Sequence, residues 1–200
     1  MNLTTESGIN VHNLRADLIR IFPKALAALE QVKTAQIVEG FLAEAGANAI
    51  AIHQFPLYLR SEAAPKYATE LAQVEWIYHD LQQPDLVSIK QQALTSENPI
   101  YQINPFCRTI CLEYDLLEFN LAAGLWCFAP LSSAQVQALS LTQPQAYVLD
   151  LMSEGLGFKR ESLVQHLTKS DCMDGEGLSQ KDAASEIQPL IESGIIQPKF

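Results

Sequence analysis

The stretch TICLEYDLLEFNLAAGLWCFAPLSSAQVQALSL, residues 109–141, decides the fold class of this chain. At its start, apolar residues alternate with polar or small ones, which predicts a half-buried β-strand. The two sets are Ile110, Leu112, Tyr114 and Leu116 against Thr109, Cys111, Glu113 and Asp115. Residues 125–129 and 136–141 predict two further short strands, because the intervening Pro and Ser residues are typical of a turn. We therefore expect a small antiparallel sheet.

The preceding residues have a different period. From Asn13 to about Leu94 apolar residues recur at helical spacing, in segments separated by Pro and Gly. The clearest helix is predicted over residues 67–81. One stripe of it carries Tyr67, Leu71, Val74, Tyr78 and Leu81. Trp76 lies on the opposite side, beside Ala68 and Ala72. A helix with a second apolar patch is expected to be contacted on two sides.

The residues after the predicted sheet indicate two or three helices and a returning strand. Pro144 lies in the first turn of a helix that runs to about Ser153, and residues 160–167 predict a second helix. A last helix is predicted to be capped by Ser179 and closed by Gly194, with Ile195 and Ile196 returning as a strand. Helices on a small sheet favour a winged-helix layout. The predicted class is thus α+β, with a helical bundle over residues 1–98 and the sheet with its winged-helix-like part over residues 99–200.

Charge and hydropathy exclude several classes of partner. The formal net charge is −10, and residues 142–200 hold five Lys/Arg against nine Asp/Glu, a net of −4. Such a surface repels the phosphate backbone, so we expect no nucleic-acid partner. The longest uncharged apolar stretch, residues 121–131, is far shorter than the ~20 residues that span a bilayer. With neither a membrane span nor a secretory signal in the sequence, the expected location is the cytoplasm.

Residues that could carry chemistry do not converge in the sequence. The four histidines, His12, His53, His79 and His166, show no metal-binding spacing. Cys107 and Cys111 lie ~13 Å apart along a strand, too far to share a zinc ion or a disulfide. All four cysteines are therefore interpreted first as small buried apolar residues. The acidic loop 170–177 lacks the ligand spacing of an EF-hand and is expected to be solvated. This pattern favours a binding protein over an enzyme, with no cofactor or metal in this chain.

A resemblance to a known family rests on four segments. These are the run Leu14–Leu29 with Phe22-Pro23, then Phe41-Leu42, then Phe55–Leu59, then Leu71–Trp76. Their order and spacing over residues 13–82 resemble the helical domain of the HvfC/BufC family, whose members work beside multinuclear non-haem iron oxidases. Residues 103–114, including Arg108, resemble the family's first strand after that domain. Farther on, the likeness is one of outline only.

The resemblance implies a function that composition and spacing alone do not show. Within the family, the chain is most similar to the MbnC branch of methanobactin biosynthesis, which serves copper acquisition. The implied partners are an MbnB-like iron oxidase, which carries the metal, and an MbnA-like ribosomal precursor peptide. The oxidase would convert cysteines of the peptide to oxazolone and thioamide groups. The present chain would be a non-catalytic subunit that helps hold the leader, through a part resembling a RiPP recognition element.

Two sets of site residues follow as hypotheses. A leader strand is expected to add to the C-terminal sheet. The segment Leu125–Ala129 motivates this, with Trp126 and Phe128 facing one side and Tyr147 and Leu151 beside it walling a groove. The set is Leu125, Trp126, Cys127, Phe128, Tyr147 and Leu151, although each aromatic residue is as readily a core residue.

The oxidase is expected to cover Ala72 and Trp76, with Arg108 as a further interface residue. The alternative for Trp76 is packing against a neighbouring helix or the C-terminal part. The alternative for the whole chain is a winged-helix DNA-binding transcriptional regulator, although residues 160–167 lack the basic character that a recognition helix needs.

Overall fold

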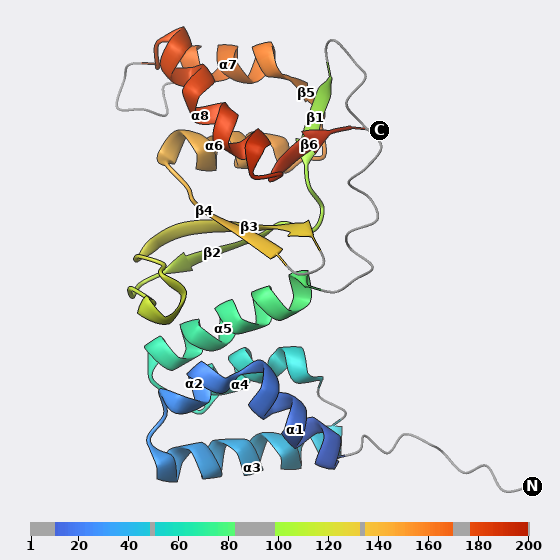
Figure 1. The fold of residues 1–200 in the computed structure, drawn as a ribbon, viewed down its shortest axis with the longest axis vertical. Helices are drawn as coiled ribbons and strands as arrows, with labels where there is room; N and C mark the ends of the chain where they lie inside the picture. Colours follow the sequence, from blue (N-terminus) through green and yellow to red (C-terminus); the bar gives the residue numbers. More distant parts are fainter. Residues whose placement is uncertain (1–10, 49–50, 83–98, 133–134, 170–176, 200) are drawn as a thin grey trace, which may run out of the picture. The chain divides into compact units, whose positions relative to one another are not determined.

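The computed structural model describes residues 11–48, 51–82, 99–132, 135–169 and 177–199 (Figure 1). The chain forms two compact units, and neither is a single stretch of sequence. Unit 1 comprises Met1–His79 and Glu113–Ala122, and unit 2 comprises Asp80–Leu112 and Ala123–Phe200. Helices and two small antiparallel sheets confirm the α+β class. The expected boundary at residue 98 lies outside the described residues.

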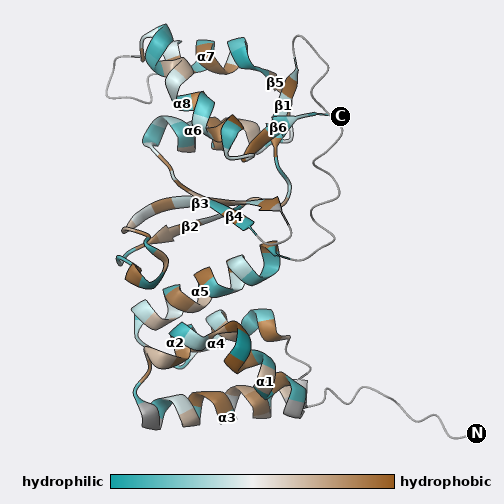
Figure 2. Ribbon diagram, viewed as in Figure 1, coloured by the Kyte–Doolittle hydropathy of each residue, from teal (hydrophilic) through white to brown (hydrophobic). Residues whose placement is uncertain are grey.

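Unit 1 is built from helices, as the spacing of its apolar residues predicts. They are α1 (Val11–Ile21), α2 (Pro23–Ala27), α3 (Gln31–Asn48), the 3-10 turn η1 (Ile52–Gln54), α4 (Phe55–Ser61) and α5 (Lys66–Leu81). Hydrophobic and hydrophilic residues alternate around α1, α3 and α5 (Figure 2). Phe22, Phe41 and Phe55 are wholly buried, and Phe55 lies 4.9 Å from Phe22 and 5.2 Å from Phe41, ring centre to ring centre. These aromatic contacts form the centre of the unit.

Helix α5 is covered on two faces, as expected. Leu71, Val74 and Leu81 of the main stripe are wholly buried, and so are Ala68 and Ala72 on the other side. Burying both faces stabilises the helix mainly through the hydrophobic effect, at roughly 25 cal/mol per Å² of apolar surface.

Residues 113–122 pack with the helices rather than with the sheet that precedes them. The Glu70 carboxylate, in the middle of α5, accepts hydrogen bonds from the backbone N–H groups of Glu113 (2.9 Å) and Tyr114 (3.2 Å). The Tyr67 hydroxyl donates to Glu118 at 2.6 Å. The strand predicted to reach Leu116 therefore stops at Leu112, because a side chain rather than a neighbouring strand binds the next backbone groups.

Unit 2 contains both sheets (Figure 1). The first has the order β5-β1-β6, formed by Phe158–Lys159, Ile100–Ile103 and Ile196–Pro198. The second has the order β2-β3-β4, formed by Arg108–Leu112, Gly124–Ser132 and Gln135–Ser140. The strands predicted at residues 125–129 and 136–141 are confirmed as β3 and β4. Below, the β2-β3-β4 sheet is called sheet B.

Three helices complete unit 2, as predicted: α6 (Gln143–Met152), α7 (Arg160–Lys169) and α8 (Gln180–Glu192). Local signals set their ends. Thr142 and Gln145 form a capping box at the start of α6, and the Ser179 hydroxyl accepts from the Asp182 N–H at 3.2 Å at the start of α8. The core lies between these helices and the strands, around residues such as Cys127, Leu163 and Ile187, all wholly buried. Among the described residues, no helix is both long and apolar enough to cross a bilayer.

Candidate functional site

The strand that was expected to receive a peptide is the central strand of its sheet. β3 pairs with β2 through Arg108↔Phe128 to Leu112↔Gly124, and with β4 through Trp126↔Ser140 to Ser132↔Gln135. A peptide cannot add directly beside Leu125–Ala129, because its backbone groups are already paired on both sides. Addition of a peptide to the sheet stays a prediction, and among the described strands it requires β2 or β4, the two edges of sheet B.

The outer edge of β4 presents backbone groups that no other described strand pairs. The Leu141 N–H donates to the Leu125 carbonyl at 2.8 Å, so these two residues form a hydrogen-bonded pair. Bonded and non-bonded pairs alternate along antiparallel strands. Since Leu141 is at a hydrogen-bonded position, Ser140, Ala138 and Val136 are at positions that form no hydrogen bonds with β3. The N–H and C=O groups of these three residues therefore point away from β3. Pro130, which lacks an N–H, lies opposite Val136 at a non-bonded position, in agreement with this pattern.

This edge lacks the usual protection against strand addition. Natural sheets protect their edges with charged residues, proline or very short strands. β4 has the sequence QVQALS, six residues with no charge and no proline. Helix α8 is fixed at the end of β4, because Glu186 accepts hydrogen bonds from the Thr142 hydroxyl (2.7 Å) and, through its carbonyl, from the Gln145 amide (3.2 Å). Among the described strands, the outer edge of β4 is thus unpaired, and the strand ends beside an anchored helix.

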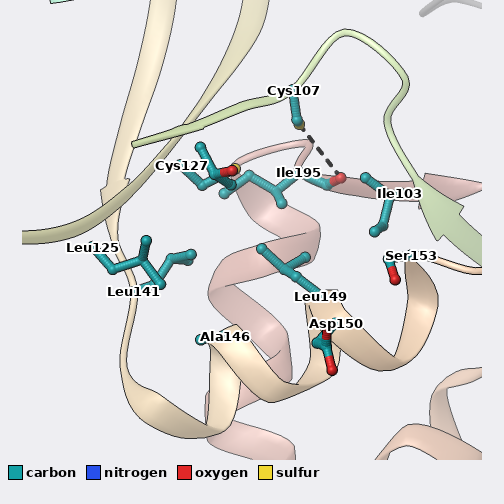
Figure 3. A pocket seen from close by; sticks show the side chains of 11 residues that line it. Ile103, Cys107, Leu125, Cys127, Leu141, Ala146, Leu149, Asp150, Ser153 and Ile195 are labelled. Carbon is teal, nitrogen blue, oxygen red and sulfur yellow. Dashed lines mark hydrogen bonds between the residues drawn. The ribbon is translucent and has the colours of Figure 1, made fainter. Parts of the chain in front are cut away.

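An apolar cavity of about 370 Å³ lies in unit 2, between α6 and sheet B, and none of its lining residues belongs to β4 (Figure 3). Leu125 and Leu141 extend into it from the strands, and Leu149 points into it from α6. The remaining lining residues come from β1, β2, β3, α6 and the turn before β6: Ile103, Cys107, Thr109, Cys127, Ala146, Asp150, Ser153 and Ile195. Most of the lining is apolar, as in sites that hold one apolar group of a ligand.

Only two of the six residues expected to bind the leader line this cavity. Leu125 and Cys127 do, whereas Trp126 and Phe128 point to the opposite face of sheet B, because successive strand residues alternate. Phe128 is wholly buried and Trp126 is partly buried. The core interpretation therefore holds for Phe128, which has no surface left for a ligand.

The face of α6 that lines the cavity differs from the expected one. Tyr147 and Leu151 are partly buried against the core of unit 2 and do not line the cavity. The wall is instead the adjoining stripe of α6, at spacings of three, four and seven residues from its first member: Ala146, Leu149, Asp150 and Ser153. The four residues lie on one side of the helix by their spacing, but the polar Asp150 and Ser153 make this side look solvent-facing in the sequence.

Among the described residues that line the cavity, Asp150 is the only carboxylate and none is a Lys or Arg. Asp150 and Ser153 are exposed, whereas Leu149 is only 9% exposed, so the polar residues lie at the mouth and the apolar ones inside. The Asp150 carboxylate has no side-chain hydrogen bond or ion pair with another described residue. Within the described part of the chain, the carboxylate at the mouth of the cavity has no cationic partner.

The cysteines differ in burial. Cys127 is wholly buried, Cys107 is partly buried and donates its thiol to the Ile195 carbonyl at 3.6 Å, and Cys111 is exposed. The interpretation of all four as buried small residues is wrong for Cys111, because it lies on an edge strand of sheet B. Cys172 and the acidic loop lie outside the described residues except for Gly177. In the described part of the chain, no three His, Cys, Asp or Glu side chains lie together so as to hold a metal ion.

The three residues expected at a partner interface lie in different environments. Ala72 is wholly buried and has no surface for another protein. Trp76 is partly buried in an aromatic group of unit 1, with ring centres 6.4 Å from Phe22, 5.9 Å from His53 and 5.4 Å from His79. Packing on neighbouring helices, the alternative for Trp76, is therefore present.

Arg108 also has a partner within the chain, because its guanidinium forms an ion pair with Asp80 at 2.9 Å. Both side chains remain partly exposed, with 42% and 30% of their surface accessible. Exposed ion pairs of this kind contribute about 0–1 kcal/mol to stability. Little free energy is therefore lost if Arg108 leaves Asp80 to contact another molecule.

Comparison with known proteins gives no family for this chain. No protein-family model matches it, and no curated protein matches it.

Proposed function

We propose that this chain is a non-catalytic partner subunit of a peptide-modifying, iron-dependent oxidase, and that it binds the leader of a ribosomal precursor peptide. The precursor's cysteines would be oxidised to oxazolone and thioamide groups by the MbnB-like partner, as in methanobactin biosynthesis. The iron belongs to the partner in this proposal. The support for the oxidase is the likeness of residues 13–82 to the HvfC/BufC family, and the support for peptide binding is the open edge of β4.

The β4 edge carries the peptide-binding proposal. An extended peptide gains affinity by hydrogen bonding along a strand edge, and pockets beside the edge give specificity. Val136, Ala138 and Ser140 offer three N–H donors and three C=O acceptors to such a strand. At about 0.5–1.5 kcal/mol net for each hydrogen bond, six bonds supply several kcal/mol before side chains contribute. The leader would then form a fourth strand of sheet B.

The DNA-binding alternative is disfavoured by the charge of α8. Besides residues 160–167 in α7, α8 is a second candidate for the recognition helix, which enters the major groove and needs basic residues. Helix α8 has one base against three acids, namely Lys181 against Asp182, Glu186 and Glu192. Repulsion from the phosphates would oppose docking of this helix. Salt-sensitive binding of duplex DNA near physiological ionic strength would revive the alternative.

A proline at Ala138 tests the edge directly. Proline is tolerated at an edge position whose N–H faces outward, so Ala138→Pro should leave the pairing of β4 with β3 intact while removing one donor. Losing about 1 kcal/mol weakens binding roughly fivefold, and the ring adds a clash with the incoming strand. The control is Ala138→Ser, which keeps the N–H and a small side chain.

The measurement uses the leader of the precursor encoded beside the oxidase gene, titrated into the full chain and followed by amide chemical shifts. We expect shifts along residues 136–140, an affinity reduced in Ala138→Pro and retained in Ala138→Ser. Shifts confined to residues 13–82, or equal affinity for the two variants, would contradict binding at β4. Co-purification with the oxidase tests the other half of the proposal, and failure of the co-expressed proteins to associate would exclude it.

A further inference from the structure

We infer that the outer edge of β4 pairs with the same edge of a second copy of this chain, forming a weak two-fold dimer. Among the described strands this edge is unpaired, it is symmetric about Ala138, and it lies in the longest uncharged stretch of an acidic chain. The pairing itself does not depend on the proposed function. Its competition with the leader, for the same edge, rests on that function.

The hydrogen-bonding groups of the edge are complementary to themselves. Val136, Ala138 and Ser140 point their N–H and C=O groups away from β3. When two such edges meet antiparallel with the two-fold axis at Ala138, Ala138 lies opposite its own copy and Val136 lies opposite Ser140 of the second copy. Each directly opposed pair exchanges two hydrogen bonds, so every outward-pointing group of both edges finds a partner. A shift of two residues in either direction would leave groups unpaired at the ends.

The absence of charge is what an identical partner requires. A residue on the two-fold axis meets its own copy, so a charge there would face the same charge and oppose the pairing. A different partner imposes no such condition. The chain has a net charge of −10 and 18% charged residues, yet residues 119–149, which include β3 and β4, contain no Asp, Glu, Lys or Arg. The uncharged stretch therefore favours a second copy as the partner.

One carboxylate borders the strand, but the two-fold axis keeps it away from its copy. The Glu186 carboxylate accepts a hydrogen bond from the Thr142 hydroxyl, beyond the end of β4. Thr142 is four residues from Ala138, about 13 Å along an extended chain, so the two Glu186 groups would lie roughly 26 Å apart on opposite sides of the axis. The Debye length at physiological ionic strength is about 8 Å, so this repulsion is largely screened.

The dimer is expected to be weak and to respond to salt. Two short edges bury less than the ~1,200 Å² of a stable interface, so the dissociation constant should be roughly 10 µM to 1 mM. Two acidic chains also repel each other at long range, and salt screens this repulsion. Raising the ionic strength should therefore tighten the dimer. A dimer held by ion pairs would instead be weakened by salt.

Sedimentation equilibrium of the full chain without any peptide measures the association, at concentrations on both sides of the expected dissociation constant and at low and physiological salt. Ala138→Asp and Ala138→Lys each place a charge on the axis, and each should weaken the dimer about tenfold or more. An equimolar mixture of the two variants should dimerise again, because opposite charges then face each other. This recovery also separates repulsion from misfolding, since a misfolded variant would not be rescued.

A cross-link tests the register. In the proposed pairing the two Ala138 Cα atoms are about 5.5 Å apart, within the range of a disulfide, so Ala138→Cys should form covalent dimers in a glutathione buffer. The matched control is Gln137→Cys, whose copy is displaced by two residues along the strand. The two Gln137 Cα atoms are then roughly 8 Å apart, too far for a disulfide. Both variants also carry Cys111→Ser, since Cys111 is exposed, and Cys172→Ser.

The expected result is a wild-type dimer that salt strengthens, loss of the dimer in each charged variant with recovery in the mixture, and cross-linking through Ala138→Cys but not Gln137→Cys. A wild-type chain that is monomeric over the whole concentration range, a mixture that does not recover, or equal cross-linking of the two cysteine variants overturns the inference.

Adding the leader separates this inference from the proposed function. The leader should dissociate the dimer, because both occupy the outward groups of β4. A dimer that binds the leader without dissociating supports the inference and contradicts β4 as the leader site. A monomeric chain that binds the leader along residues 136–140 overturns the inference and leaves the proposed function standing.

Discussion

Replacing Trp76 with alanine should destabilise unit 1 by about 2 to 4 kcal/mol. Truncation of a fully buried Trp costs about 3–5 kcal/mol, and each aromatic pair adds about 0.5–1.5 kcal/mol to burial alone. Trp76 contacts the wholly buried Phe22 and the rings of His53 and His79, so the expected loss of stability is close to that of a fully buried Trp. Its partial exposure lowers the estimate to the stated range.

Urea unfolding at 25 °C, followed by far-UV circular dichroism, measures this loss. The two units need not unfold together. The reference protein therefore also carries Trp126→Phe, so that its tryptophan fluorescence comes from Trp76 alone and reports the unfolding of unit 1. Trp76→Phe is the matched control, since it keeps an aromatic ring against Phe22 and should lose about half as much stability. A loss below about 1 kcal/mol in Trp76→Ala, together with failure to co-purify with the oxidase, would refute the packing argument and make Trp76 an interface anchor.

Two further predictions concern the buried carboxylates of α5. Burial raises the pKa of Glu75, although its hydrogen bonds from the Lys24 and Ala25 N–H groups oppose the shift. A carboxyl group with a higher pKa in the folded than in the unfolded state stabilises the folded protein most at pH values below 4.5, its ordinary pKa. This stabilisation is lost as the pH rises through the pKa of the folded state. Glu75→Gln should therefore flatten the fall in stability above pH 4.5 in pH-dependent urea titrations, and an unchanged slope would contradict this. Glu70→Ala should release the two backbone groups it binds, so hydrogen exchange at Glu113 and Tyr114 should accelerate by about tenfold or more, and unchanged protection would contradict the role of Glu70.

Local signals were sufficient to predict most elements. The helix over residues 67–81, the strands at 125–129 and 136–141 and the Ser179 cap are all present, because each depends on residues a few positions apart. The alternation of apolar and polar residues predicted a strand that continues to Leu116, but the strand ends at Leu112. Glu70, more than forty residues upstream, binds the backbone at Glu113, and no local pattern contains that contact.

The candidate site was less predictable than the fold. The uncharged sequence of β4 was visible, but its position at the edge of sheet B depends on the order of all three strands. The cavity face of α6 was missed because Asp150 and Ser153 are polar, although they share a stripe with Leu149. Such a face is distinguished from a solvated one only by what packs opposite, which is a tertiary property.

The segment 113–122 has a consequence for dissecting this protein by truncation. It packs in unit 1, yet both of its ends continue into neighbouring strands of sheet B. A fragment cut at the apparent boundary near residue 98 would keep Tyr67 and Glu70 but lose the groups they bind, leaving the buried Glu70 carboxylate without its backbone donors. The reciprocal fragment would carry residues 113–122 with no helices to receive them. Neither half of the gene encodes a complete folding unit, so an exchange of domains between relatives would have to move residues 113–122 together with the N-terminal helices.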